Sequence, residues 1–160
     1  MIVGEQPGDH EDLAGQPFVG PAGQVLDAAL AEAGIQRAEV YLTNAVKHFK
    51  HEPRGKRRLH KTPHAGEVQA CRWWLEQERR LVQPRLILAM GATAGLAVLG
   101  RKPSVMAERG ALIETPDGAR VLLTLHPAFV LRVPDPEARR RAQASLVEDL
   151  KMARREAGLA

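Results

Sequence analysis

The chain has 160 residues, of which 44% are hydrophobic and 26% are charged. This composition is typical of one globular domain, residues 1–160, and excludes a disordered or fibrous protein. The single cysteine excludes an internal disulfide, and neither a signal peptide nor an apolar stretch of about 20 residues is present. We therefore expect a cytoplasmic protein that does not bind membranes, and we expect it to act as a monomer.

The net charge of +4 is concentrated in one segment. Residues 47–61 contain seven Lys or Arg and one Glu, so this segment has a charge of +6 and the rest of the chain has −2. A basic patch on a nearly neutral domain indicates a polyanionic partner. Lys56, Arg57 and Arg58 are its candidate phosphate contacts, and the plainer alternative is a solvated surface.

Apolar stretches and turn signals alternate along the chain and predict strands that alternate with helices. The expected elements, in chain order, are a strand at 1–3, a helix at 22–33, a strand at 40–43, a loop at 47–61, a helix at 62–82 with Thr62 as its N-cap, a strand at 86–90, a helix at 92–99, a hairpin of 111–114 with 120–125, and a helix at 136–156. This order predicts an α/β fold with a mainly parallel sheet covered on both faces. The first strand is short beside the usual length of about 5–6 residues, so we expect the natural protein to begin upstream of Met1.

Ligands of such folds bind outside the carboxyl ends of the strands, and four residues of interest fall there or in the adjoining loops. Glu5 follows the first strand, Asn44 and His126 end later strands, and Phe18 lies in a Gly/Pro-rich loop before a helix. Each also has a purely structural interpretation. Glu5 would be a solvated turn carboxylate, Phe18 a core plug, Asn44 a turn cap, and His126 a histidine satisfied by backbone.

The basic segment and the next helix add further histidines and the cysteine. His60 closes the basic run, where it is either incidental or chemically active. His48, His51 and Cys71 raise the question of a metal, but the chain has no CxxC motif and these three residues are not in HxxxH spacing. A buried, inert thiol is the alternative interpretation of Cys71.

The order and placement of six motifs resemble the uracil-DNA glycosylase superfamily. The motifs are GEQPG, FVGPAG, YLTNAVKHFK, GKRRLHKTP, ACRWWLE and LHPA. The resemblance is greatest to the UdgX-type branch, which is related to the family-4 iron–sulfur enzymes. It implies a three-layer α/β/α sandwich with a central, mainly parallel four-stranded sheet. It also implies a pocket that takes a uridine flipped out of DNA, with single-stranded DNA accepted.

The resemblance also implies a role for each site residue. Phe18 would stack on uracil, Asn44 would bind its O4/N3 edge and exclude cytosine, and His126 would stabilise the uracilate leaving group. Glu5 and Gln6 match a polar pair beneath the sugar. The chain departs from its relatives at Ala128, where many carry a serine.

His60 separates three hypotheses about the outcome of the reaction. In the UdgX-type branch the matching histidine attacks C1′ and remains bound to the abasic site, so the leading hypothesis is a single-turnover enzyme that crosslinks to DNA. The first alternative is a hydrolytic family-4-like glycosylase in which His60 only contacts phosphate. The second alternative is a non-catalytic DNA-binding module.

The resemblance further implies a 4Fe–4S cluster. Cys71 matches its last ligand, and His48 occupies the place of a family-4 cysteine, but the upstream pair of cysteines is absent. A 4Fe–4S cluster normally needs four ligands. We therefore expect either no cluster or a damaged fold, in a chain that lacks its natural N-terminal segment.

Overall fold

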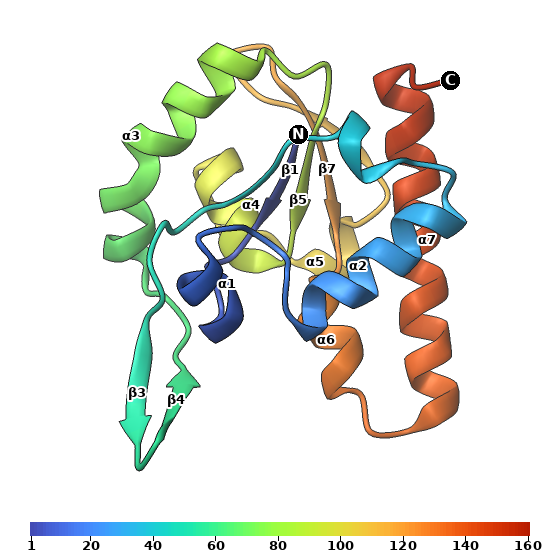
Figure 1. The fold of residues 1–160 in the computed structure, drawn as a ribbon. Coiled ribbons are helices and arrows are strands. Elements are labelled where there is room, and N and C mark those ends of the chain that lie inside the picture. The colour runs from blue at the N-terminus through green and yellow to red at the C-terminus, as the bar shows by residue number, and fades with distance from the viewer.

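A computed structural model describes residues 1–160, and its centre is a five-stranded sheet (Figure 1). The strand order is β2 (Leu42–Asn44), β1 (Ile2–Gly4), β5 (Ile87–Met90), β7 (Arg120–Thr124) and β6 (Leu112–Glu114). The first four strands are parallel, and β6 pairs with β7 in the antiparallel sense at the edge. The predicted mainly parallel sheet is confirmed, but it has five strands and not the expected four, because the predicted hairpin adds β6 to its edge.

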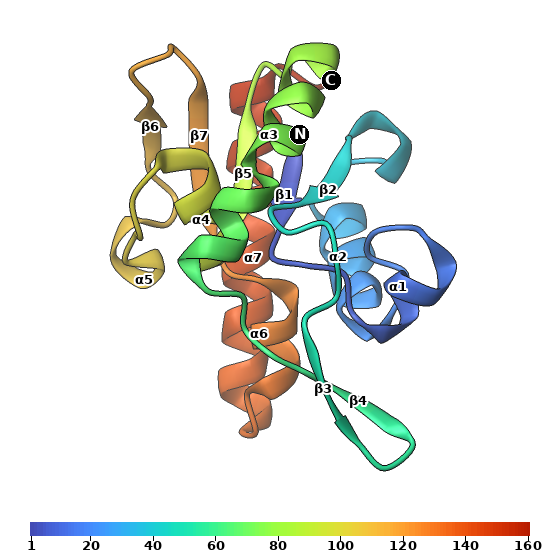
Figure 2. The ribbon, with the colours of Figure 1, turned by 90° about the vertical axis from the view of Figure 1, so that its left-hand side faces the viewer.

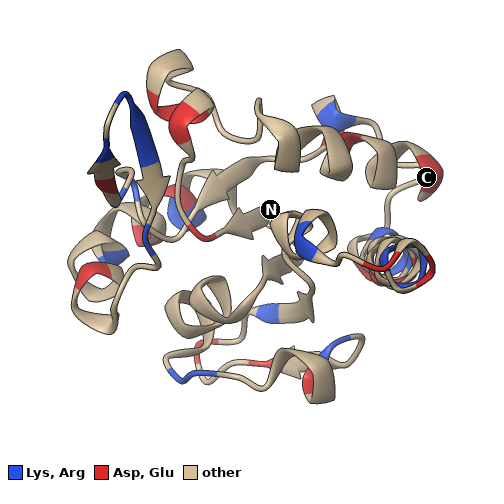
Figure 3. Cartoon of the chain, turned by 90° about the horizontal axis from the view of Figure 1, so that it is seen from below, with Lys and Arg blue, Asp and Glu red and all other residues tan.

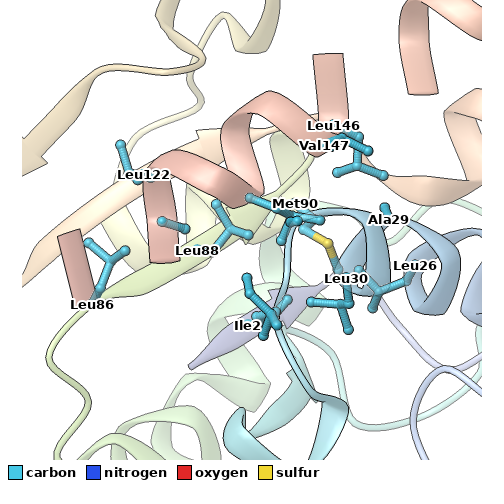
Figure 4. Packing of buried hydrophobic residues seen from close by; sticks show 14 of the residues in the cluster. Ile2, Leu26, Ala29, Leu30, Leu86, Leu88, Met90, Leu122, Leu146 and Val147 are labelled. Atoms are coloured by element: carbon cyan, nitrogen blue, oxygen red, sulfur yellow. The ribbon is translucent and has the colours of Figure 1, made fainter. Parts of the chain in front are cut away.

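Helices cover both faces of the sheet, which makes the predicted three-layer sandwich. On one face lie α2 (Pro21–Glu32) and α7 (Pro136–Ala157), and on the other lie α3 (Ala65–Val82) and α4 (Ala92–Leu99). Strand β5 is buried on both sides because Leu88 and Met90 pack toward α2 and α7, as Figure 4 shows, while Ile87 and Ala89 pack toward α3 and α4. A strand that is buried on both faces is continuously apolar, and the apolar run of β5 therefore predicted a buried strand from the sequence.

The remaining elements are short and lie around the ends of the strands. They are α1 (Asp9–Ala14), a 3₁₀ turn (Arg37–Glu39), β3 (His51–Arg54), β4 (Arg57–His60), α5 (Val105–Glu108) and α6 (Pro127–Arg132). The hairpin β3–β4 extends beyond the carboxyl ends of the sheet strands, as the two side views show (Figures 1 and 2). No helix of the protein is both long and apolar enough to span a membrane.

Two sequence-based expectations about the basic segment were wrong. Residues 51–60 form a two-stranded antiparallel hairpin and not a loop, with Gly55 at positive φ (61°) in its turn. Most side chains of this hairpin are exposed, so no alternation of apolar and polar residues marks its strands. Helix α3 begins at Ala65 and not near Thr62, because His64 is the N-cap and shares a capping box with Glu67.

The buried carboxylate of Asp149 ties α7 to Arg109 after α5 through an ion pair and to the end of β7 through a hydrogen bond from Thr124. Arg109 donates to both carboxylate oxygens of Asp149 at 2.8 and 2.9 Å, and the Thr124 hydroxyl donates to the same carboxylate at 2.6 Å. Burial raises the pKa of Asp149 in spite of these bonds. Removing one member of such a group leaves the other buried without its partner.

We therefore expect Asp149→Ala to lower the free energy of unfolding by about 3–5 kcal/mol. Urea denaturation followed by circular dichroism measures this change. The matched control is Glu137→Ala, which breaks the exposed pair with Arg141 and should cost less than about 1 kcal/mol. Equal effects of the two substitutions would show that the buried pair has no special role.

Candidate active site

One cavity of about 710 Å³ opens at the carboxyl ends of the parallel strands. Its wall comes from the loops after β1, β5 and β7, the end of β2, the hairpin and the segment that leads into α3. Six residues predicted from the sequence line it together: Glu5, Gln6, Phe18, Asn44, His60 and His126. Segments from all parts of the chain therefore meet at the place where the strand-end rule expects a ligand.

Glu5 is held at both carboxylate oxygens. Its Oε1 lies 2.9 Å from Nε2 of His60, and its Oε2 accepts a hydrogen bond of 2.7 Å from the Thr93 hydroxyl. Burial opposes the charge on Glu5, but the bonds from His60 and Thr93 outweigh burial, so the pKa of Glu5 lies below its ordinary value. The cavity thus holds a fixed negative charge beside an imidazole whose side chain is 45% exposed.

Thr93 is a site residue that the sequence reasoning did not name. It lies in the first turn of α4, directly after β5 and Gly91. Because ligands bind at the carboxyl ends of parallel strands, the Thr93 hydroxyl in the turn after β5 could have been recognised from the sequence as a candidate site group.

Gln6 fastens the hairpin to the end of β1. Its amide donates to the carbonyl oxygens of Lys50 and Lys61 at 3.2 and 3.0 Å, and its Oε1 accepts from the Lys50 N–H at 3.0 Å. Lys50 and Lys61 are the residues that flank the two hairpin strands. Gln6 therefore sets the base of the element that carries His60, in addition to lining the cavity.

Phe18 and Asn44 form a tightly packed wall of the cavity. Phe18 is 5% exposed and has a positive φ of 53°, and its loop is held by Arg37, which donates to the carbonyl of Phe18 at 3.0 Å. A Cβ at Gly4 would lie 2.5 Å from the Phe18 ring and 2.6 Å from Oδ1 of Asn44, so only glycine fits there. The Oδ1 atom of Asn44 is buried and accepts no hydrogen bond from the protein. It is an acceptor without a partner at the cavity wall.

His126 is a neutral hydrogen-bond donor in this cavity. Its Nδ1 accepts from the Ala128 N–H at 3.0 Å and caps α6, so the proton of the neutral ring resides on Nε2. Burial is the main cause that lowers the pKa of His126 from 6.5 to about 4. The imidazole therefore stays uncharged at neutral pH and retains an N–H that the cap does not use.

The lowered pKa of His126 predicts an acid-dependent loss of stability. Between pH 6.5 and about 4, His126 is protonated in the unfolded chain but stays neutral in the folded protein. The free energy of unfolding therefore decreases as the pH falls through this range. The loss reaches about 3 kcal/mol at most. Unfolding free energies measured from pH 7 to 4 should fall less steeply for His126→Ser, which keeps a capping hydroxyl. Identical slopes for the two proteins would contradict this prediction.

The cations of the hairpin differ in their surroundings. Arg58 pairs with Asp9 and Asp12 of α1 and lies over the Phe49 ring at 5.2 Å, so its charge is used within the protein. Lys56 and Arg57 are exposed near the tip and form no ion pair with a carboxylate. Basic residues are drawn in blue in the view from below in Figure 3. Of the three predicted phosphate contacts, Lys56 and Arg57 are the ones with free charge.

Cys71 and His48 lie side by side, with Sγ 3.9 Å from Nδ1. Cys71 is buried, and its sulfur also accepts from the Lys47 N–H at 3.5 Å. No group of three or more His, Cys, Asp or Glu side chains is arranged to hold a metal ion. Two neighbouring side chains do not match a 4Fe–4S cluster, which takes four ligands, so the residues of this chain do not fit that group.

Comparisons with known proteins identify the class of protein to which this fold and this cavity belong. The family model of the uracil DNA glycosylase superfamily matches residues 1–151, and the chain belongs to this superfamily. The predicted class of enzyme, a uracil-DNA glycosylase that acts on N-glycosidic bonds, is confirmed.

Within the superfamily the chain is similar to type-4 uracil-DNA glycosylases. It is 39% identical to that of Thermotoga maritima over 155 residues, which are 96% of this chain and 75% of the relative. It is 42% identical to that of Pyrobaculum aerophilum over 141 residues, which are 84% of this chain and 68% of the relative. The similarity confirms the superfamily, and the UdgX-type branch stays a prediction.

Proposed function

We propose that this chain excises uracil from DNA by binding the flipped base in the cavity at the strand ends. The observation that carries the proposal is a complementary pair of groups, the unpartnered Oδ1 of Asn44 and the free Nε2–H of His126. Uracil presents an N3–H donor and the O2 and O4 acceptors. One buried acceptor and one neutral donor in the same cavity match this pattern.

Binding requires the base to leave the helical stack of the DNA. The Phe18 ring would replace the lost stacking, which is worth about 1–3 kcal/mol per base on an aromatic side chain. Oδ1 of Asn44 would accept from uracil N3–H, and its amide N–H₂ would donate to O4. Cytosine offers the opposite donors and acceptors at these two positions, so buried amide atoms would lose their partners at about 1–3 kcal/mol each.

Cleavage of the N-glycosidic bond leaves its electron pair on uracil and positive charge on the sugar. His126 would donate its Nε2–H toward O2, where the negative charge of the leaving uracilate develops. Glu5 is ionised and fixed by His60 and Thr93, so it would stabilise the oxocarbenium-like sugar. A donor and an anion at opposite ends of the breaking bond favour the charge separation of the transition state.

For the final step we propose attack by water, which is supported by the similarity to type-4 uracil-DNA glycosylases. Glu5 would orient a water molecule toward C1′ and accept its proton as the C1′–O bond forms. The products are free uracil and an abasic site, and the protein is released for another cycle.

A second outcome is favoured by one observation, the His60–Glu5 contact of 2.9 Å at the cavity wall. In this alternative an imidazole nitrogen of His60 forms the bond to C1′ while the glycosidic bond breaks. The proton on the other ring nitrogen passes to Glu5, so charge balances. The protein would then remain covalently attached to the abasic site after one turnover, as the UdgX-type resemblance implies.

The two outcomes are separated by incubating the chain with a uracil-containing single-stranded oligonucleotide. Hydrolysis predicts several abasic sites per protein molecule and no band of reduced mobility on a denaturing gel. Covalent capture predicts at most one event per molecule and a shifted band that resists heat and detergent, and this band should disappear in His60→Ser. Absence of both abasic DNA and the shifted band would overturn the proposed function itself.

A further inference from the structure

Phe18 has a backbone conformation that a phenylalanine rarely adopts. Its φ of 53° lies in the left-handed region that favours glycine, and yet its side chain is buried in the wall of the cavity. The ring lies 6.1 Å from the ring of His126, measured between the centroids. An unfavourable backbone conformation of this kind persists only where neighbouring groups hold it in place.

One arginine bonds to both peptide groups that flank Phe18. Nη2 of Arg37 donates to the carbonyl of Pro17 at 2.8 Å, and Nη1 donates to the carbonyl of Phe18 at 3.0 Å. The first carbonyl belongs to the peptide group before the Phe18 Cα and the second to the peptide group after it, so the two bonds together restrain φ and ψ of Phe18. Neither carbonyl accepts a hydrogen bond from another group of the protein. The planar fork of a guanidinium suits this double contact.

Arg37 itself lies outside the cavity and close to the surface. It does not line the cavity, and its other partner is Asp27 of α2, at 2.6 Å. The side chains of this pair are 38% and 50% exposed, and ion pairs with such exposure contribute little to stability. The 3₁₀ turn that carries Arg37 leads into β2, which ends at Asn44. Arg37 therefore ties the loop of Phe18 to the segment that leads to Asn44.

We propose that Arg37 is a positioning residue for recognition of the base. It restrains both peptide groups around Phe18 and so holds the aromatic ring in place before the base arrives, which spares binding the cost of ordering the loop. Without these bonds the loop adopts other backbone conformations, and only a fraction of the molecules presents the ring for stacking. The affinity for the base falls by that fraction. This inference rests on the proposed function, because it takes uracil as the base that stacks on Phe18.

The first test observes the Phe18 ring in the absence of DNA. The chain has three phenylalanines, so fluorine NMR of protein labelled with para-fluorophenylalanine gives one signal for each, and the signal missing from Phe18→Ala belongs to Phe18. In Arg37→Gln this signal should shift and broaden, while the other signals keep their positions. Asp27→Asn is the matched control, because it removes the ion pair but neither carbonyl bond, and its spectrum should match that of wild-type protein. An unchanged Phe18 signal in Arg37→Gln would overturn the inference whatever the activity of the variant.

The second test measures recognition of the base without cleavage. A fluorine atom at C2′ of the nucleotide disfavours positive charge on the sugar and so slows cleavage, and the readout is the ratio of the Kd values of two such single-stranded oligonucleotides, one with cytosine and one with uracil. Arg37→Gln should lower this preference for uracil about tenfold, the effect of roughly one net hydrogen bond on an equilibrium constant, and leave the Kd for cytosine unchanged.

A double-mutant cycle shows whether Arg37 acts through Phe18. In the background of Phe18→Ala, Arg37→Gln should have no further effect on the preference for uracil, because the ring that Arg37 positions is already absent. A further loss in that background would assign Arg37 a general structural role and overturn the inference. If wild-type protein neither excises uracil nor prefers it over cytosine, the proposed function is contradicted instead, and the fluorine signal of Phe18 still reports whether Arg37 holds the ring.

Discussion

Replacing His126 by serine should lower the rate of uracil excision by about 10²–10³-fold, the usual effect of removing one donor from a developing oxyanion. The imidazole is neutral because burial lowers its pKa to about 4, and its cap to Ala128 leaves the Nε2 proton free. Serine caps a helix well but is too short to place a donor where Nε2 lies. Single-turnover measurements with a uracil-containing oligonucleotide report the rate of the bond-breaking step.

The pH dependence of the rate distinguishes a donor from a mere structural cap. If neutral His126 is the donor, the wild-type rate should show no ionisation of this group between pH 5 and 8. A fall in the wild-type rate with a midpoint near pH 6.5 that is absent from His126→Ser would contradict the assignment. So would a serine variant with a rate within threefold of wild type.

The second large effect is expected at Asn44. Leucine has a similar size but no hydrogen-bonding atoms, so Asn44→Leu would leave the uracil edge without partners in a buried site. We expect kcat/KM for uracil to fall about 10²–10⁴-fold, because loss of two buried hydrogen bonds costs about 1–3 kcal/mol each. The measurement is excision from matched oligonucleotides that contain uracil or cytosine at one position.

A structural control accompanies this variant, because Asn44 also ends strand β2. Its Oδ1 accepts no hydrogen bond from the protein, so the substitution removes no internal hydrogen bond of that atom. The thermal unfolding midpoint should therefore change little compared with the loss of activity. A proportionate loss of stability and activity would indicate that Asn44 only supports the fold.

The sequence was sufficient to place the residues that lie at strand ends. Glu5 and His126 follow the ends of β1 and β7 and Asn44 is the last residue of β2, and the geometry of a parallel sheet brings such positions together. The core was equally visible, because β5 is buried on both faces and α7 buries one face between Ala142 and Ala153.

The contact between His60 and Glu5 could not be derived in this way. The two residues are 55 positions apart, and His60 reaches the cavity on a hairpin whose exposed strands show no periodicity. Its position depends on Gln6 at the hairpin base and on the ion pairs of Arg58 with α1, which are long-range contacts. Only the family resemblance indicated a role for His60 from the sequence. That role belongs to the UdgX-type branch, and membership of this branch stays a prediction.

The most direct test of uracil excision by this protein is to measure free uracil released from a single-stranded oligonucleotide with one uracil, beside an identical oligonucleotide with cytosine. We expect free uracil in an amount equal to the abasic sites formed, with no cytosine released, and strong loss of release in Asn44→Leu and His126→Ser. Intact oligonucleotide after prolonged incubation with excess folded protein, or equal release of uracil and cytosine, would contradict it.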